Sequence, residues 1–344
     1  STPHRLHAAP HPSRGPMLGG DTPDLWLAAY SGVMRWSSGG SEPELVGPDP
    51  SKLARLAATA RPLGLAPALG PLVADDDGAH HMARVGRVRD YLAAGDVYQV
   101  NLARRLVAHV AAPGDALALY AALAAVAPAP YGALIETDGA AIISGSPERF
   151  LSAHRTFVET RPIKGTHPRA PGGAAALAAS EKDAAEHLMI VDLERNDLGR
   201  IAEIGSVRVD ELGYVVELPA LYHKVSRISA VPRAGTGYAT LLRATFPGGS
   251  ITGAPKLRAM QIIDELEPAR RGLYCGAFGY FGPTGCELAL AIRIGVITGD
   301  ELRVHVGGGI VADSDPAAEL AETEVKAAGW RAALAALSAG PSRT

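Results

Sequence analysis

Acidic side chains fall at helical spacing in two separate segments of the chain. Asp183 and Glu186 are three residues apart, so both would lie on one face of a helix. Glu319, Glu322 and Lys326 follow one another at i, i+3 and i+7, again on one face. Carboxylates from two such helices could meet on Mg²⁺, which prefers oxygen ligands and usually binds one or two carboxylates, waters and an anionic substrate. Spacing alone favours a plainer interpretation, in which both faces are solvated and Glu322 pairs with Lys326.

Two basic residues occupy unusual positions in predicted strands. Lys164 ends one strand, between Pro162 and Gly165. A lysine is most often a solvated cation, but a desolvated lysine loses its proton more easily and can act as a nucleophile. Arg293 interrupts the apolar run 287–297, where an arginine needs an anionic partner. That partner is either a structural carboxylate or a ligand.

A run of three glycines follows the predicted strand 301–306. Consecutive glycines can expose backbone N–H groups to an anion, or can simply permit a bend or bulge between a strand and a helix. Both interpretations of Gly307, Gly308 and Gly309 are open at this level. A second stretch, 248–256, has the glycine spacing of a phosphate loop, but Ala-Pro stands where Lys-Ser/Thr is required, which excludes that nucleotide site. Its Thr252 could face a binding site.

The elements that must position these residues are mostly short strands joined by tight turns. Apolar runs at 131–136 and 140–144 flank an Asp-Gly pair, which predicts a hairpin. Further strands are predicted at 24–30, 157–163, 276–281, 287–297 and 301–306. Consecutive hairpins indicate a largely antiparallel sheet and argue against a Rossmann-type series of βαβ units.

Four helices are predicted from capping residues and from residues that stop helices. One covers 83–94 and ends at Gly95, which suits a left-handed C-terminal cap. Ser180 can cap a second helix that reaches about residue 198, with Asp183 at the acidic position of a capping box. Pro residues open the other two, at 255–266 and 315–337.

Composition and charge narrow the class of protein. With 344 residues, 47% of them hydrophobic, the chain can bury a large core. Its formal net charge of -3 gives no basic field, so nucleic acid is not an expected partner. Cys275 and Cys286 form no CxxC pair, and His187 and His223 belong to no metal-binding spacing, so both histidines are more typical of structural residues. No apolar run could span a membrane and no signal peptide is evident, so we expect no membrane partner and a cytoplasmic location.

Several ordered motifs together resemble those of the chorismate-utilising enzymes, which include anthranilate, aminodeoxychorismate, isochorismate and salicylate synthases. The resemblance covers roughly residues 80–330, and its motifs are YQVNL (98–102), GSPERF (145–150), RPIKGT (161–166), EHLMIVDLERNDL (186–198), FPGGSITGAPK (246–256), YCGA (274–277), IR (292–293), GGGIVADS (307–314) and ExxxK (322–326). It implies an α+β fold of two packed antiparallel sheets with outer helices. Residues 81–338 would form the chorismate-binding catalytic domain, and 1–80 a short N-terminal region integrated in it.

The resemblance also implies roles for individual residues. Glu186 and Glu322 would hold Mg²⁺, which binds the ring carboxylate of chorismate, with Lys326 supporting that site. Glu148 would be the general acid that protonates the departing C4 hydroxyl. The enolpyruvyl carboxylate would be bound by Tyr274, Arg293 and the amides of Gly307, Gly308 and Gly309. Further residues would line the substrate site: Gln99, Thr166, His223 and Thr252.

Two positions distinguish the branches of this family. Water-adding relatives carry a base lysine where this chain has Gln99, and an amide cannot deprotonate water. Anthranilate synthases typically have Ala where this chain has Lys164, whereas aminodeoxychorismate synthases typically have Lys. The resemblance therefore implies amination at C4 through a covalent lysine intermediate, with anthranilate synthesis or an inactive chorismate-binding paralogue as alternatives.

The partner implied by the resemblance is a glutamine amidotransferase that supplies ammonia. Neither cysteine of this chain sits in the Gly-x-Cys-x-Gly elbow of a glutaminase, so ammonia is expected from a separate subunit or from solution. The motif that binds regulatory tryptophan in related enzymes is not found in the N-terminal region.

Overall fold

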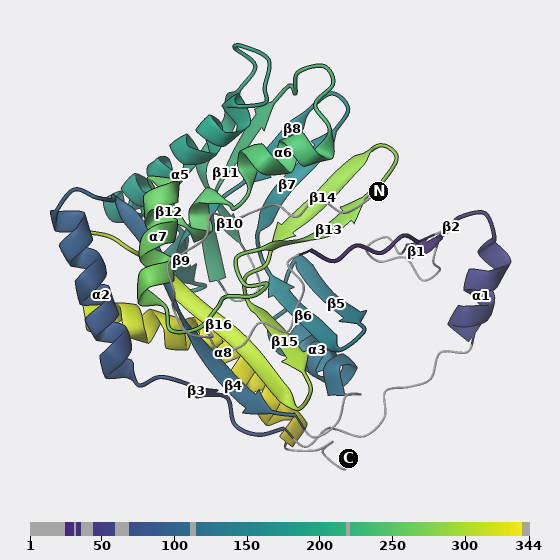
Figure 1. The fold of residues 1–344 in the computed structure, drawn as a ribbon, viewed down its shortest axis with the longest axis horizontal. Helices are drawn as coiled ribbons and strands as arrows, with labels where there is room; N and C mark the ends of the chain where they lie inside the picture. The colour runs from purple at the N-terminus through teal and green to yellow at the C-terminus, as the bar shows by residue number, and fades with distance from the viewer. Residues whose placement is uncertain are drawn as a thin grey trace.

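Two antiparallel sheets of seven strands each form the body of the structure (Figure 1). This computed structural model describes residues 25–30, 32–35, 44–58, 69–110, 115–217 and 221–338. The α+β class and the antiparallel sheets expected from the sequence are confirmed. No helix in the described ranges is long and apolar enough to cross a bilayer.

The first sheet carries the run of three glycines. Its strand order is β12-β4-β16-β15-β6-β5, and β3 pairs with β4 at one end. The bounds are β3 (Val73–Ala74), β4 (Gln99–His109), β5 (Tyr131–Thr137), β6 (Ala140–Ser146), β12 (Gly253–Ala254), β15 (Ile294–Thr298) and β16 (Glu301–Ile310). The hairpin β5–β6 confirms the turn predicted from Asp-Gly.

The second sheet carries Lys164 on a strand that stands off its main path. Its order is β10-β11-β8-β7-β14-β13, and β9 pairs with β11. The bounds are β7 (Arg149–His154), β8 (Val158–Arg161), β9 (Ile163–Pro168), β10 (Arg208–Glu217), β11 (Leu221–Ala230), β13 (Ala277–Phe281) and β14 (Gly285–Leu290). The single strand predicted at 157–163 is therefore the end-to-end pair β8 and β9.

Helices bury their apolar stripes against both sheets. The bounds are α1 (Pro50–Ala58), α2 (Gly78–Ala93), α3 (Asp115–Val126), α4 (Gly173–Ala179), α5 (Glu181–Gly199), α6 (Tyr238–Thr245), α7 (Lys256–Leu266) and α8 (Pro316–Ser338), with a short 3₁₀ turn η1 (Gly249–Ile251). A separate two-stranded sheet pairs β1 (Val33–Arg35) with β2 (Glu44–Val46). In Figure 1 this small sheet and α1 lie on the opposite side of the molecule from α2.

Local capping explains where the long helices begin. The Ser180 hydroxyl accepts a hydrogen bond from the Asp183 N–H at 3.2 Å, as predicted for the start of α5. Asp77 does the same for α2 by accepting from the His80 N–H at 2.8 Å, so this helix begins five residues before the predicted position 83. Gly95 has φ of 79°, the left-handed conformation expected just after that helix.

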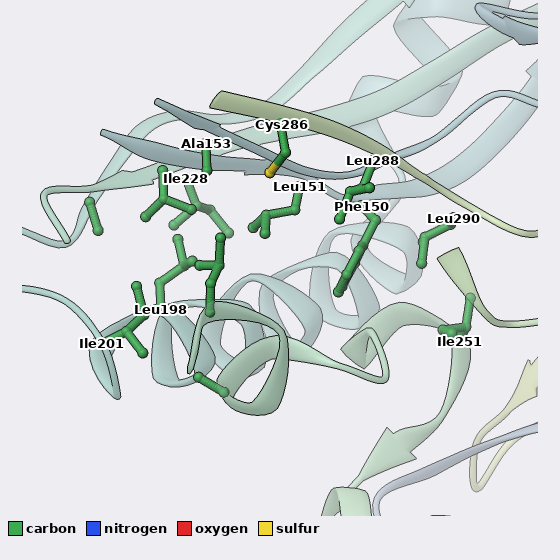
Figure 2. Packing of buried hydrophobic residues seen from close by; sticks show 14 of the residues in the cluster. Phe150, Leu151, Ala153, Leu198, Ile201, Ile228, Ile251, Cys286, Leu288 and Leu290 are labelled. Carbon is green, nitrogen blue, oxygen red and sulfur yellow. The ribbon is translucent and has the colours of Figure 1, made fainter. Parts of the chain in front are cut away.

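A separate apolar core packs against each of the two sheets. Ile143, Val304 and Leu119 pack with Trp330 of α8 beneath the first sheet, and the buried positions of α8 recur at spacings of three and four. Figure 2 shows the second core, where side chains of the second sheet point toward α5. Its members include Phe150, Leu151, Leu288, Leu198 and Ile201.

The chain passes between the two sheets four times, and two of these passages, from β6 to β7 and from β14 to β15, are neighbours. The apolar run predicted as one strand, 287–297, is two strands, β14 in the second sheet and β15 in the first. Arg293 stands in the passage with φ of 50°, and this left-handed residue turns the chain between the sheets. The prediction of one continuous strand was wrong. Both halves of the run are apolar because each is buried in a sheet core, so the sequence does not show that the two cores differ.

The other corrections concern the N-terminus and the glycines. Residues 25–30 form no strand, and Asp24 of the predicted strand 24–30 lies outside the described residues. Gly307, Gly308 and Gly309 form no bend, because all three are paired with β4 as regular members of β16. Their glycine identity therefore needs a reason other than a turn.

Candidate active site

Two neighbouring passages between the sheets bring Glu148 and Arg293 together. Glu148 lies between β6 and β7, and Arg293 lies between β14 and β15. The strands on either side are paired, and the passages themselves are joined because the Gly145 N–H donates to the Arg293 carbonyl at 3.0 Å. The Leu290 N–H also donates to the Glu148 carbonyl at 3.1 Å. The backbone thus holds a carboxyl and a guanidinium at the junction of the sheets.

The Glu148 carboxyl is buried in a setting that favours its protonated form. It is only 5% exposed, and this burial raises its pKa to about 7. The Ser250 hydroxyl donates to Oε1 at 3.0 Å and the Ile163 N–H does so at 3.5 Å, while the charges of Lys164 and Arg293 also favour the carboxylate. A carboxyl with this balance can hold and release a proton near neutral pH, as a general acid must.

Lys164 reaches from the second sheet to the first. A Cβ atom built on Gly309 would lie 2.9 Å from Lys164 Nζ and 3.0 Å from Gln99 Cδ. Burial lowers the pKa of the Lys164 ammonium, the carboxylate of Glu186 opposes this, and the ammonium of Lys326 adds to it. When it is deprotonated, this amine has a lone pair that can act as a nucleophile.

The amide of Gln99 has unused hydrogen-bonding capacity. Its side chain is 0% exposed, yet neither Nε2 nor Oε1 has a partner among the described residues. A buried amide without partners costs about 1–3 kcal/mol, so such groups usually meet water or a ligand. This orphaned amide lies beside the Lys164 amine and marks where a polar ligand would fit.

Close approach explains the three glycines. A Cβ on Gly307 would lie 2.5 Å from the Leu102 carbonyl oxygen, which is not tolerated. A Cβ on Gly308 would lie 3.1 Å from Glu319 Oε2 and 3.4 Å from Glu322 Oε1. Because Gly308 has no side chain, the carboxylates of α8 can lie directly against β16. Gly309 likewise leaves room for the Lys164 amine.

An acidic group forms where α5 and α8 approach Lys164. The Lys326 amine pairs with Glu322 at 2.6 Å and donates to the Gly307 carbonyl at 2.6 Å. Glu186 and Glu322 both act electrostatically on the Lys164 amine, so the two carboxylates lie near the same side chain. No cluster of three or more metal-type ligands occurs in the described part of the chain. All-oxygen donors with fewer than three protein ligands fit Mg²⁺, which keeps waters and takes substrate oxygens.

Tyr274 lies buried below the glycine strand. Burial raises the pKa of its phenol well above the ordinary value, so the hydroxyl remains a donor. The side chain of Asn101 hydrogen-bonds to this phenol, and Asn101 is the register partner of Gly309. The phenol is thus directed to the glycine end of β16.

The remaining predicted site residues differ in whether their polar side-chain atoms already have hydrogen-bond partners. The Thr166 hydroxyl bonds His223 Nδ1 at 3.0 Å, and His223 Nε2 is buried without a partner in the described residues. Burial and the nearby charge of Arg293 lower the pKa of His223 to about 4, so the ring is neutral. The Thr252 hydroxyl is used locally, donating to the Gly248 carbonyl at 2.9 Å. The Thr252 carbonyl is used as well, since it accepts a hydrogen bond from the Asn101 N–H at 2.8 Å.

Sequence reasoning missed two polar residues that support the site. Ser250 bonds Glu148, and the signal was its place inside the glycine-rich stretch 248–256. Glu194 is buried on α5, eight residues after Glu186 and therefore on a similar face of that helix. Its Oε2 lies 2.8 Å from the Thr160 hydroxyl, and its pKa is raised to about 8 chiefly by burial.

Similarity to known proteins extends along most of the chain. A family model for chorismate binding enzymes matches residues 9–331. Aminodeoxychorismate synthase component 1 of Escherichia coli is 48% identical over 244 residues, which cover 69% of this chain and 53% of the relative. Anthranilate synthase component 1 of Streptomyces coelicolor is 44% identical over 254 residues, covering 71% of this chain and 49% of the relative.

A solved structure is similar as well. Anthranilate synthase component I from Streptococcus pneumoniae matches with a TM-score of 0.75 at 32% identity, covering 82% of this chain and 65% of that one. The chain spans about half the length of the curated relatives it matches.

Proposed function

The chain belongs to the chorismate-binding enzyme family, and from that premise we propose that it replaces the C4 hydroxyl of chorismate with ammonia. The product is 4-amino-4-deoxychorismate, the precursor of 4-aminobenzoate in folate biosynthesis. One observation carries the proposal: the amine of Lys164, whose pKa is lowered by burial, lies against Gly309 beside the unpartnered amide of Gln99.

The first half of the reaction forms a bond to Lys164. Its neutral amine attacks C2 of the ring, the ring double bond shifts, and the C4 hydroxyl leaves as water with the proton of Glu148. Burial supports both roles, since it lowers the pKa of the lysine ammonium and raises that of the Glu148 carboxyl to about 7. A neutral amine and a protonated acid can therefore coexist near neutral pH.

The second half releases the enzyme. Ammonia attacks C4, the double bond shifts back, and the bond from C2 to the lysine nitrogen breaks, which restores the Lys164 amine. The proton lost by the incoming ammonia returns to Glu148, so the acid is ready for the next cycle. The net change is exchange of hydroxyl for amine at C4 with release of water.

Two positive regions would hold the dianionic substrate at opposite ends. Arg293, the Tyr274 phenol and backbone amides of the glycine strand would bind the enolpyruvyl carboxylate, which fixes the ring over Lys164. Glu186 and Glu322 would hold Mg²⁺, whose charge would offset that of the ring carboxylate. The oxygen-only donor set near Lys326 supports that assignment.

Ammonia would come from a glutamine amidotransferase subunit. The names of several relatives identify them as component 1 of their enzyme, which supports a second component. Both cysteines of this chain are buried, and burial raises the pKa of Cys275 to about 11, which makes it unsuitable as a glutaminase nucleophile. We infer a cytoplasmic enzyme that receives ammonia from its partner.

Anthranilate synthesis is the second candidate, because relatives of that name match the chain at 44% identity. The experiment is incubation of the protein with chorismate, Mg²⁺ and ammonium, followed by chromatography of the products. We expect aminodeoxychorismate, identified by its conversion to 4-aminobenzoate with a lyase. Direct release of anthranilate and pyruvate would overturn the proposal. Lys164→Ala is expected to abolish C4 amination, while Lys52→Ala on α1 serves as the matched control.

A further inference from the structure

We propose that His305 is a positioning residue for substrate binding, which holds the ring of Tyr274 in the plane that directs its phenol to the substrate carboxylate. This inference rests on the proposed function, because Tyr274 is assigned to the carboxylate there. His305 belongs to none of the motifs that carry the family resemblance, and it precedes Gly307 by two residues on β16.

The two rings form a parallel stack. Their centroids are 5.4 Å apart and their planes differ by 15°, which is an offset stacked arrangement. Both side chains are buried, His305 at 8% exposed and Tyr274 at 6%. The stack therefore joins the strand that bears the three glycines to the segment that bears the phenol.

The charge state of His305 is fixed by its surroundings. Burial lowers its pKa to about 3, and the cations Arg105, Arg271 and Arg303 act in the same direction, while a hydrogen bond to the Arg270 carbonyl opposes them. Nε2 is buried and has no partner within the described residues, so the bond to that carbonyl comes from Nδ1–H. The ring is neutral and tethered to the chain just before Tyr274.

A second side chain holds the other end of this segment. Arg271 lies with its guanidinium carbon 5.6 Å from the Tyr274 ring centroid. It donates to Glu267 and to the Asn101 carbonyl, both at 2.6 Å, and to the Ile251 carbonyl at 3.1 Å. The phenol also bonds Asn101, so the stack on His305 acts beside these contacts as a further constraint on how far the Tyr274 ring can turn.

The consequence should appear in binding. An aromatic stack is worth about 0.5–1.5 kcal/mol beyond the area it buries, which corresponds to a roughly 2- to 12-fold change in an equilibrium constant. If the phenol binds substrate and transition state alike, loss of the stack raises KM and leaves kcat nearly unchanged. His305→Phe keeps a flat ring and should stay within about twofold of the wild type.

The test is a double-mutant cycle on the full chain with chorismate and Mg²⁺. The dissociation constant of chorismate is measured by calorimetry for the wild type, His305→Ala, His305→Phe, Tyr274→Phe and Tyr274→Phe combined with His305→Ala. We expect His305→Ala to weaken binding in the wild type and to have no further effect when the phenol is already absent.

Three results would overturn the inference: equal weakening by His305→Ala with and without the phenol, equal weakening by His305→Phe and His305→Ala, or no weakening at all. If His305→Ala does not fold, His305→Leu takes its place, since leucine fills the space without an aromatic ring: weaker binding by His305→Leu than by His305→Phe supports the stack, and equal binding by the two contradicts it. Failure of the wild type to bind chorismate would instead contradict the proposed function itself.

Discussion

Glu194 is a buried carboxyl without a cation of its own. It is 8% exposed, and the nearest ammonium, that of Lys256, is paired with Asp197 at 2.5 Å. Burial is the main reason that its pKa rises to about 8, and the charges of Glu148 and Asp197 add to the rise. The Thr160 hydroxyl lies 2.9 Å from the Phe150 carbonyl and 2.8 Å from Glu194 Oε2. Because its one hydrogen can be donated to the Phe150 carbonyl, its oxygen can accept a hydrogen bond from protonated Glu194. The structure thus favours a protonated Glu194.

This burial predicts a specific dependence of stability on pH. In the folded state the pKa is about 8 and the ordinary value for a glutamate is 4.5, so the folded protein binds more protons than the unfolded chain between those limits. The stability contribution is therefore complete below the unfolded value and is lost as the pH rises toward about 8. At about 1.4 kcal/mol per pH unit, a rise from about pH 5 to about pH 8 removes up to about 3–4 kcal/mol.

Glu194→Gln isolates this effect, because glutamine keeps the shape and a donor to Thr160 but does not titrate. The free energy of unfolding is measured with urea from about pH 5 to about pH 8 for the wild type, for Glu194→Gln and for the exposed control Glu203→Gln. We expect the first variant to gain stability relative to the wild type as the pH rises, by up to the amount above, and the control to follow the wild type. Parallel curves for Glu194→Gln and the wild type would refute the reasoning.

Other predictions concern the catalytic groups. Gly309→Ala should lower kcat/KM by at least about tenfold without unfolding the protein, because its methyl group would lie 2.9 Å from Lys164 Nζ. The control Gly86→Ala should match the wild type, because nothing lies within 4 Å of its new methyl group. Since Glu148 must be protonated and its pKa is about 7, kcat/KM should fall as the pH rises above about 7. Glu148→Gln should lower the rate about 10²- to 10⁴-fold and remove that fall, and a fall that persists in the variant would assign it to another group. Glu322→Gln should weaken Mg²⁺ binding measured by calorimetry without substrate, and unchanged affinity would remove this carboxylate from the metal site.

Local signals predicted much of the secondary structure. The hairpin at Asp138-Gly139, the cap of α5 and the start of α8 at Asp315-Pro316 were predicted correctly, because such features depend on a few neighbouring residues. The long-range pairing was not predictable in this way. Nothing in the run 287–297 distinguishes a strand that stays in one sheet from two strands buried in different sheets, apart from Arg293 itself.

The sequence predicted only those site residues that belong to the family's motifs. The sequence identified Lys164, Glu148 and the three glycines, but it did not show that the glycines lie in a regular strand and are small because α8 and Lys164 press on them. Glu194 was missed because one sequence does not reveal which face of α5 the second sheet covers. Burial by distant segments is what shifts the pKa values of Lys164, Glu148 and Glu194.

The central claim is a transient bond between the Lys164 nitrogen and the substrate ring. The direct measurement is peptide mass mapping after the protein is mixed with chorismate and Mg²⁺ without ammonia and then rapidly denatured. We expect the peptide containing Lys164 to gain the mass of chorismate less one water, and later addition of ammonium before denaturation to remove the adduct. An unmodified Lys164 peptide, together with wild-type amination by Lys164→Ala, would contradict it.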